Sequence, residues 1–163
     1  MSKINNTISS LSEEEINAIE EEVSHLPDRK SAAIEALRIV QSHRGWVSDT
    51  TLAAIAQQLG MSSAELDSIA TFYNLIHRQP VGRHVIMMCD SVSCYVMGCE
   101  KVHRTICDHL KVAPGETTED ERFTVLPIVC LGACDKAPVV MIDDELIENI
   151  SSDSVADVLE RYA

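Results

Sequence analysis

Apolar residues in the first half of the chain recur at the spacing of a helix face. In the segment from Leu11 to Leu26, residues Ile16, Ile19, Val23 and Leu26 follow one another every three or four residues, which is the repeat of an amphipathic α-helix. Ser12 followed by Glu15 has the pattern of a capping box, and Pro27 ends the segment because proline cannot continue a helix. The same periodicity returns three times further along. The pattern therefore predicts helices over approximately residues 11–26, 33–45, 48–60 and 62–73.

The second half of the chain has a different pattern, which begins at Pro80-Val81-Gly82. His84–Cys89 is a short apolar run after a turn, as expected of a buried strand. The stretch 96–112 carries apolar residues on one helical stripe, and a polar loop follows it. Further strands are predicted over 123–129, 139–142 and 145–150, with a last helix over 152–162.

These elements predict an α+β chain of two domains. Residues 1–80 are predicted to form an N-terminal helical bundle, with Trp46, the only tryptophan, as an anchor of its core. Residues 81–163 are predicted to form a small domain in the order β-α-β-β-β-α. Four of the six cysteines follow directly after two of its strands, and in α/β sheets functional sites collect at the carboxyl ends of strands. The sequence therefore places the candidate site at those two strand ends.

The composition is that of a globular protein, and the first residues of the chain predict that it stays in the cytoplasm. Hydrophobic residues make up 45% of the chain and charged residues 24%, and no apolar run approaches the roughly 18–20 residues of a membrane helix. The first ten residues lack the basic and apolar regions of a signal peptide. A net charge of −13 disfavours binding to nucleic acid or to an anionic membrane surface. Because thiols stay reduced in the cytoplasm, six cysteines favour metal or redox chemistry over structural disulfides.

The spacing of the cysteines narrows this chemistry. Cys89 and Cys94 form a C-x4-C pair, and after 35 intervening residues Cys130 and Cys134 form a C-x3-C pair. A four-residue gap can wrap around something wider than a single ion, and four thiolates are the usual ligands of a [2Fe–2S] cluster. Structural zinc sites accept gaps of two to four residues, so a zinc-stabilised interaction module is an alternative. A thiol oxidoreductase is another, although its usual C-x-x-C motif is missing.

Two cysteines stand outside these pairs. Cys99 lies on the apolar stripe of the predicted helix, where a free cysteine acts as a small hydrophobe, and Cys107 is predicted to be a helix residue without a chemical role. The chain contains neither a G-x-G-x-x-G motif nor a P-loop that would cradle a nucleotide. Small residues next to the two pairs leave room for backbone N–H groups to approach sulfur, and Gly132 among them can supply a positive φ angle. These small residues are Ser91, Ser93, Gly132 and Ala133.

Both cysteine segments resemble those of a known family. They read CDSVSC (89–94) and CLGACDKAP (130–138), and they are similar to the small thioredoxin-like [2Fe–2S] subunits in the NADH-oxidising module of respiratory complex I. The helical half, which includes AIEALRIVQSHRGWVSDTTL (33–52), also resembles this family, so the resemblance covers essentially the whole chain. It implies an N-terminal helical bundle followed by a thioredoxin-like α/β [2Fe–2S] ferredoxin domain. Related subunits serve NAD-linked hydrogenases and formate dehydrogenases, but the extent of the match favours the bacterial complex I form.

The resemblance implies a ligand set and a function. Cys89, Cys94, Cys130 and Cys134 would each ligate one [2Fe–2S] cluster. The chain would dock onto a larger flavoprotein subunit that holds FMN and binds NADH, and it would exchange single electrons with that flavin. It would therefore act as a subunit of NADH:quinone oxidoreductase without an active site of its own. Its place would be in the peripheral arm, on the cytoplasmic side of the inner membrane, without direct insertion into the membrane.

Two positions depart from the family pattern. Val129 stands before Cys130 where many relatives have glutamate, and Leu146-Ile147 replace a commonly aromatic pair. The loss of a nearby negative charge favours the reduced, more negative state of a cluster. The resemblance therefore predicts a raised reduction potential for this chain.

Overall fold

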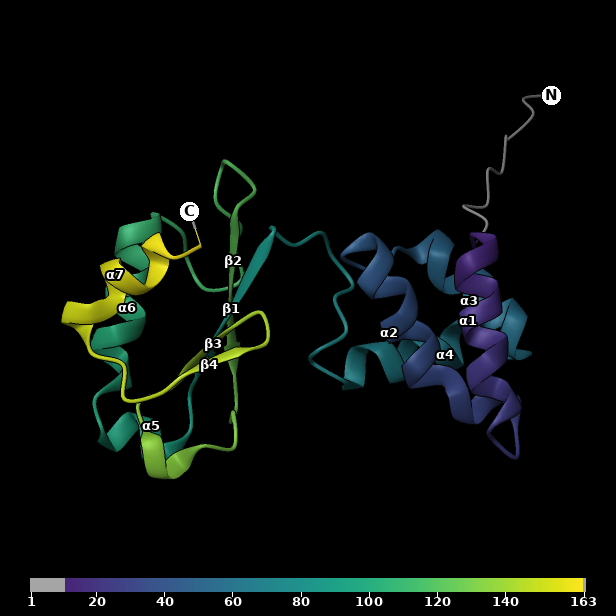
Figure 1. The fold of residues 1–163 in the computed structure, drawn as a ribbon, viewed down its shortest axis with the longest axis horizontal. Helices are drawn as coiled ribbons and strands as arrows, with labels where there is room; N and C mark the ends of the chain where they lie inside the picture. The colour runs from purple at the N-terminus through teal and green to yellow at the C-terminus, as the bar shows by residue number, and fades with distance from the viewer. Residues whose placement is uncertain (1–10, 163) are drawn as a thin grey trace. The chain divides into compact units, whose positions relative to one another are not determined.

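A computed structural model describes residues 11–162. The prediction that no signal peptide is present concerns the first ten residues, which lie outside this part. The chain forms two compact units, one on either side of the Pro80–Val81 bond (Figure 1). Within residues 11–162, no helix is both long enough and apolar enough to cross a membrane.

The described part of the N-terminal unit contains the four predicted helices. They are α1 (Glu13–Ser24), α2 (Ala33–Arg44), α3 (Asp49–Leu59) and α4 (Ser63–Phe72), with the 3-10 helix η1 (Arg29–Ala32) before α2. Ser12 begins α1 with the predicted capping box, and Ser62 begins α4 in the same way. Helices α2 and α3 end at Gly45 and Gly60, whose φ angles of 80° and 67° are left-handed and therefore favour glycine.

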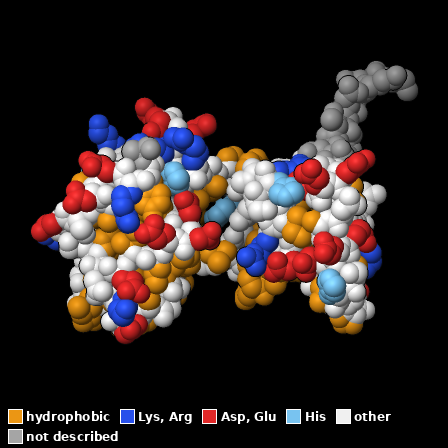
Figure 2. All heavy atoms as spheres, in the orientation of Figure 1, with side chains coloured by type: hydrophobic (Ala, Val, Ile, Leu, Met, Phe, Trp, Pro, Cys, Tyr) orange, Lys and Arg blue, Asp and Glu red, His pale blue; other side chains and the backbone are white. Residues whose placement is uncertain are grey.

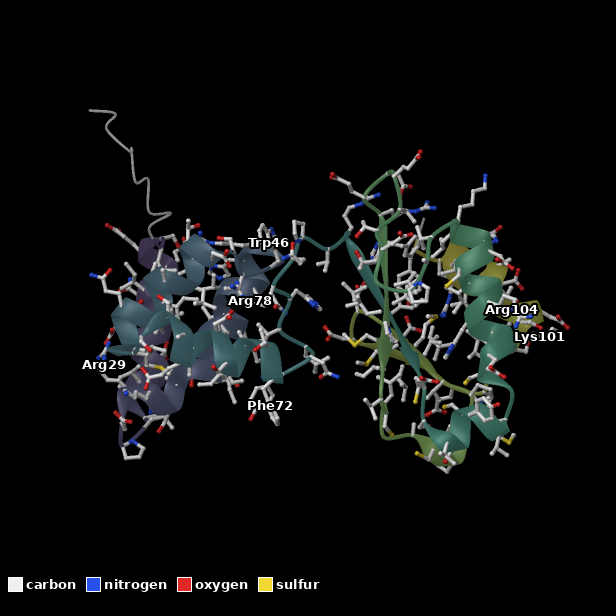
Figure 3. The ribbon with its side chains drawn as sticks, turned by 180° about the vertical axis from the view of Figure 1, so that it is seen from behind. Arg29, Trp46, Phe72, Arg78, Lys101 and Arg104 are labelled. Carbon is white, nitrogen blue, oxygen red and sulfur yellow. The ribbon has the colours of Figure 1, made fainter. Side chains whose placement is uncertain are left out.

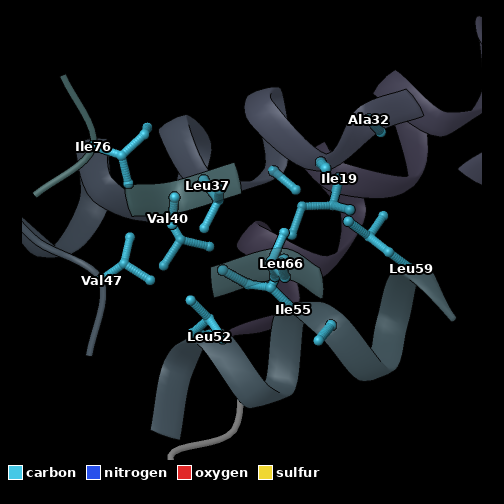
Figure 4. Close-up of a cluster of buried hydrophobic side chains, with 14 residues drawn as sticks. Ile19, Ala32, Leu37, Val40, Val47, Leu52, Ile55, Leu59, Leu66 and Ile76 are labelled. Atoms are coloured by element: carbon cyan, nitrogen blue, oxygen red, sulfur yellow. The ribbon is translucent and has the colours of Figure 1, made fainter. Parts of the chain in front are cut away.

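Apolar side chains from all four helices meet in one core (Figure 4). The largest fully buried members are Ile19, Leu37, Ile55, Leu59 and Leu66. Burying a side chain of this size contributes about 1.5–3 kcal/mol relative to leaving it exposed, so the periodic apolar positions of the sequence stabilise the bundle.

The prediction that Trp46 anchors this core is wrong. Trp46 is only partly buried and lies outside the buried cluster, whereas the next residue, Val47, is fully buried within it (Figure 3). The two residues follow the left-handed Gly45, in a segment that is not helical. Val47 therefore takes the core position that the sequence prediction gave to Trp46.

The segment after α4 is fastened to the N-terminal unit. The carbonyl oxygen of His77 accepts a hydrogen bond of 2.8 Å from the N–H of Val47. The guanidinium of Arg78 donates to Asp49 at 2.6 Å and to Asp67 at 3.0 Å. These contacts hold the backbone as far as residue 78 on the helical unit, two residues before the Pro80–Val81 bond.

A nearly buried ion pair joins α1 to α2. The side chain of Glu15 is 2% exposed, and its carboxylate accepts hydrogen bonds from Nε and Nη2 of Arg44 at 2.6 Å and 2.5 Å. One of its oxygens also accepts the Ser12 N–H, which closes the capping box. The hydrogen bond from Arg44 lowers the pKa of Glu15 below its ordinary value of 4.5, more than burial raises it.

Replacing Glu15 by glutamine is expected to lower the free energy of unfolding by about 2–4 kcal/mol at neutral pH, because it removes the carboxylate that pairs with the Arg44 guanidinium. Glutamine still suits a capping box, so the loss reports on the ion pair. Since the folded-state pKa is depressed, the pair stabilises the fold above pH 4.5 and its contribution is lost as the pH falls. Urea denaturation should therefore show a difference in the free energy of unfolding between the wild type and Glu15→Gln, and this difference should shrink toward acid pH. The exposed neighbour Glu14→Gln is the control; an equal loss in both variants would contradict the prediction.

The second unit is built around a four-stranded mixed sheet, which confirms the predicted α+β class. The strands are β1 (His84–Cys89), β2 (Phe123–Ile128), β3 (Val140–Ile142) and β4 (Glu145–Ile147), in the order β2-β1-β3-β4. β1 pairs with β2 in parallel and with β3 in antiparallel orientation, and β3 pairs with β4 in antiparallel orientation. The helical elements are α5 (Val92–Val96), α6 (Cys99–Leu110), η2 (Cys134–Lys136), η3 (Ser152–Ser154) and α7 (Val155–Glu160).

Helices α6 and α7 cover one face of this sheet (Figure 1). Val102 and Ile106 of α6 pack with Leu159 of α7 against Ile86 and Phe123 of the sheet, and all five are nearly or fully buried. The opposite face of α6 is polar, and its Lys101 and Arg104 point away from the sheet (Figure 3). The amphipathic stripe read from the sequence therefore positions α6 on the sheet.

Several element ends differ from the prediction. The helix expected over 96–112 begins only at Cys99 and ends at Leu110, because Gly98 before it has a left-handed φ of 88°, and Val96 is the last residue of the separate helix α5. The strand expected over 145–150 ends at Ile147, since Asn149 has a positive φ of 50° and Ile150 turns into the core. The last helix begins with the 3-10 turn η3 rather than as an α-helix.

Candidate metal centre

The two cysteine pairs begin at the same end of the sheet, where strands β1 and β2 finish. β1 and β2 are parallel neighbours, and Cys89 at the end of β1 lies opposite Ile128 at the end of β2. The N–H of Asp90 extends this pairing by donating to the Ile128 carbonyl oxygen at 2.8 Å. The carboxyl ends of parallel strands meet at the same edge, so Cys130, two residues beyond β2, comes to the edge where Cys89 lies.

The first pair is buried and is organised by a serine. Cys89 and Cys94 are 1% and 0% exposed. Between them, Ser91 caps the short helix α5 in extended backbone conformation, and its hydroxyl accepts the Cys94 N–H at 3.3 Å. The same hydroxyl oxygen lies 3.4 Å from the sulfur of Cys89. The sequence prediction treated this serine only as a small residue, because α5 was not predicted.

The second pair is exposed and its thiols are adjacent. The sulfur atoms of Cys130 and Cys134 lie 3.8 Å apart at the surface. Gly132 has the predicted positive φ, 82°, and its N–H donates to the Cys130 sulfur at 3.3 Å. That N–H acts to lower the pKa of Cys130, but the hydrogen bond with the Cys134 thiol, burial and the nearby Cys134 and Cys89 thiols together outweigh it and raise the pKa.

The two loops meet at Cys89. Leu131 and Ala133 of the second loop pack against the buried thiols of the first. Burial acts to raise the pKa of Cys89, but hydrogen bonds from Ser91, from the backbone N–H of Leu131 and from the Cys94 thiol outweigh it, so the pKa lies below its ordinary value. The surroundings of Cys89 therefore favour the thiolate, which is the form that binds metals.

Comparison with known sequences identifies the family. The sequence profile of the thioredoxin-like [2Fe–2S] ferredoxins matches residues 19–163. The chain belongs to this family. Among its relatives, the subunit designated E in the NADH-quinone oxidoreductase of Pseudomonas aeruginosa is 50% identical over 152 residues, which are 93% of this chain and 92% of the relative. The same subunit of Escherichia coli K12 is 47% identical over 152 residues, which are 93% of this chain and 92% of the relative.

A solved structure has the same fold. An NAD+-reducing [NiFe]-hydrogenase, in its air-oxidised state, matches 80% of this chain with a TM-score of 0.70 and 22% identity. The match covers 22% of the hydrogenase chain, so there the fold is part of a much longer polypeptide. At this identity the likeness shows the fold alone.

The cysteines suit the cluster that the family name implies. Within residues 11–162, no three His, Cys, Asp or Glu side chains converge closely enough for a single metal ion. The thiols instead gather two by two, one pair on each loop. Each iron of a [2Fe–2S] cluster takes two thiolates, whereas a structural zinc ion needs four ligands around one point. The arrangement of this thioredoxin-like ferredoxin therefore fits two irons better than one zinc.

The remaining cysteines have apolar surroundings. Cys99 is 1% exposed and packs with Cys89 and Cys94 beneath the first loop. Burial, together with the nearby Cys94, raises the pKa of its thiol. Cys107 is half-buried on α6 at the margin of the core, and burial raises the pKa of its thiol as well. Raised pKa values disfavour the thiolate, so neither cysteine is prepared to bind metal.

Exposed apolar residues surround the cysteine loops, and we call them the apolar rim. They are Val92, Tyr95, Val96, Met97 and Val129, all between 57% and 81% exposed. Hydrophobic side chains reach the surface at the end of the unit where α5 lies (Figure 2). The sequence prediction missed the rim because it placed Val129 inside a strand and left α5 out. The raised potential expected from Val129 stays a prediction.

Proposed function

We propose that this chain is the electron-transfer subunit of the NADH-oxidising module of a bacterial complex I. In this proposal Cys89, Cys94, Cys130 and Cys134 hold one [2Fe–2S] cluster. The observation that carries it is the arrangement of two thiol pairs at one sheet edge, in a family member 47–50% identical to the corresponding subunits of two NADH-quinone oxidoreductases. The function is electron transfer, and no active site for an organic substrate is assigned to the chain itself.

The chain's own residues would bind and tune the centre. A bound [2Fe–2S] cluster supplies a redox centre that takes up one electron at a time. Cys89 and Cys94 would hold it from the buried side, while Cys130 and Cys134 would hold it at the surface. The N–H groups of Leu131 and Gly132 would stabilise negative charge on the sulfur atoms. The exposed pair thus gives electrons a short path between the centre and a docked partner.

The apolar rim supports docking onto a flavoprotein subunit that carries FMN and binds NADH. A cluster of exposed apolar side chains beside a functional centre is typical of a protein interface. The net charge of −13 favours a partner surface with basic groups around an apolar patch. We propose that this contact places the chain in the peripheral arm, on the cytoplasmic side of the inner membrane.

Two alternative functions would use the same cysteines. The hydrogenase structure contains the same fold in a complex that reduces NAD+, so an equivalent subunit of an NAD-linked hydrogenase or formate dehydrogenase would use the same chemistry. The identity of 47–50% over 93% of the chain favours the complex I subunit. The other alternative, a zinc-stabilised interaction module, requires four ligands around one ion, and the thiols lie in two separate pairs.

Metal analysis combined with EPR tests the proposal. The purified chain is expected to be brown, to contain two irons and two acid-labile sulfides per chain, and to give an EPR signal after one-electron reduction. The same chain after removal of iron by a chelator is the matched control. A colourless protein that contains zinc after anaerobic purification, and that cannot be loaded with iron and sulfide, would contradict the proposal.

A further inference from the structure

Ser91 contacts both cysteines of the first pair. Its hydroxyl oxygen is 3.3 Å from the backbone nitrogen of Cys94 and 3.4 Å from the sulfur of Cys89. A hydroxyl carries one donor hydrogen and two acceptor lone pairs. It can therefore accept the Cys94 N–H and at the same time donate its own hydrogen to the Cys89 sulfur, once that sulfur is a thiolate.

We propose that Ser91 is a positioning residue that fixes the first thiol pair and raises the reduction potential of the centre. The inference rests on the proposed function, because it requires a cluster bound to Cys89. Accepting the Cys94 N–H holds α5, and with it the Cys94 sulfur, in register with the end of β1. Donating to Cys89 places a positive dipole end on one of the four sulfur ligands.

The donated hydrogen bond acts more strongly on the reduced state. The oxidised cluster with its four thiolates is already negative, reduction adds one further negative charge, and a hydrogen bond donated to sulfur strengthens as the charge on the acceptor grows. Cys89 is 1% exposed, so water cannot replace a lost donor, and the low local dielectric strengthens the interaction. Removing the hydroxyl should thus disfavour reduction.

Ser93 provides a matched control within the same loop. It lies two residues further along CDSVSC and is likewise half-buried. Within residues 11–162 its hydroxyl makes no hydrogen bond, in contrast to that of Ser91. Replacement of either serine by alanine removes one oxygen from the loop, but only Ser91→Ala removes a contact to sulfur.

The experiment is an EPR-monitored redox titration of the cluster-loaded chain and its variants. In Ser91→Ala, the ratio of reduced to oxidised cluster at a fixed ambient potential should fall by about threefold to tenfold, where tenfold is 59 mV for a one-electron couple. Ser93→Ala should leave this ratio at its wild-type value. Ser91→Thr, which keeps the hydroxyl, should also give the wild-type ratio. Ser91→Gly should match Ser91→Ala, because glycine caps a helix with little loss of stability.

The outcomes separate this inference from the proposed function. If the wild-type chain binds no [2Fe–2S] cluster, the proposed function itself fails. If the wild type binds one and Ser91→Ala or Ser91→Gly titrates at the wild-type potential, only the role of Ser91 is overturned. Loss of the cluster in both of these variants but not in Ser91→Thr supports the positioning role. Loss in all three would overturn it, because the hydroxyl would then not be what the position requires.

Discussion

Replacing any one of Cys89, Cys94, Cys130 and Cys134 by alanine is expected to abolish most of the visible absorption and the reduced EPR signal. In the proposed ligand set each residue supplies one of the four thiolates, so its loss would leave one iron with a single cysteine. Iron and sulfide analysis of the four purified variants should show that most chains of each variant carry no cluster. Wild type purified in parallel under anaerobic conditions provides the reference.

The two cysteines outside the pairs are the controls. Cys99→Ala and Cys107→Ala should keep the cluster, because the raised pKa of each thiol disfavours the thiolate that a metal binds. Cys99→Ala should lower the free energy of unfolding by about 1–2 kcal/mol, since it removes a buried sulfur atom that packs with Cys89 and Cys94. The ligand assignment is wrong if Cys99→Ala loses the EPR signal while one of the four paired variants retains it.

Because one cysteine pair is buried and the other is exposed, the four variants should also differ in the stability of the cluster-free chain. Cys89 and Cys94 are buried in the unit's interior, so their replacement by alanine should lower the melting temperature even without metal. Cys130 and Cys134 are exposed, and their replacement should leave the melting temperature of the apoprotein almost unchanged. Thermal denaturation of the four apoproteins thus separates ligand loss from packing loss.

Local sequence signals were sufficient to predict element ends where a single residue type determines the backbone conformation. Ser12 with Glu15 predicted the start of α1, and Gly45 and Gly60 predicted the ends of α2 and α3, because capping and left-handed φ depend on neighbours along the chain. The strand-end position of both cysteine pairs was predicted in the same way, from short apolar runs followed by small residues.

Features that depend on distant residues were not predicted. Trp46 is only partly buried while Val47 fills the core, and the Val47 N–H is bound to His77 in the segment after α4, a contact between residues far apart in the sequence. The burial of Cys89 and Cys94, against the exposure of Cys130 and Cys134, depends on how the second loop folds over the first. Helix α5 is too short for periodicity to reveal, and its capping serine became visible only with its contacts to both cysteines.

NADH is expected to reduce the cluster of this chain only when the flavoprotein subunit with FMN is present. NADH delivers two electrons as a hydride, and a one-electron centre cannot accept that pair directly; flavins are the cofactors that separate it. The sequence has no nucleotide-binding glycine motif, and its net charge of −13 disfavours an unaided anionic ligand. The isolated chain should therefore not oxidise NADH with ferricyanide as acceptor. Steady oxidation by a chain free of flavin fluorescence would contradict this expectation.

The signal of this chain must be distinguished from any redox centre of the partner. The cluster-free Cys130→Ala variant, mixed with the same flavoprotein, provides that control, because it removes only this chain's contribution. In the wild-type complex, NADH should produce the EPR signal that dithionite produces in the isolated chain. In the control complex that signal should be missing while NADH oxidation by the flavoprotein continues.

The apolar rim makes the partner requirement testable at one residue. Val96 is 76% exposed beside the cysteine loops, and Val96→Glu would place a charge in the contact that we propose for the flavoprotein. Because an unpaired charge is costly to desolvate, binding should weaken about tenfold or more, for which a loss of about 1.4 kcal/mol is sufficient. Reduction by NADH in the mixture should fall accordingly, while chemical reduction of the isolated variant should give the wild-type EPR signal.

Ala113→Glu is the control, because it adds the same charge at an exposed position beyond the other end of α6 and should not weaken binding to the flavoprotein. Equal binding by both variants would show that the flavoprotein does not dock on the rim.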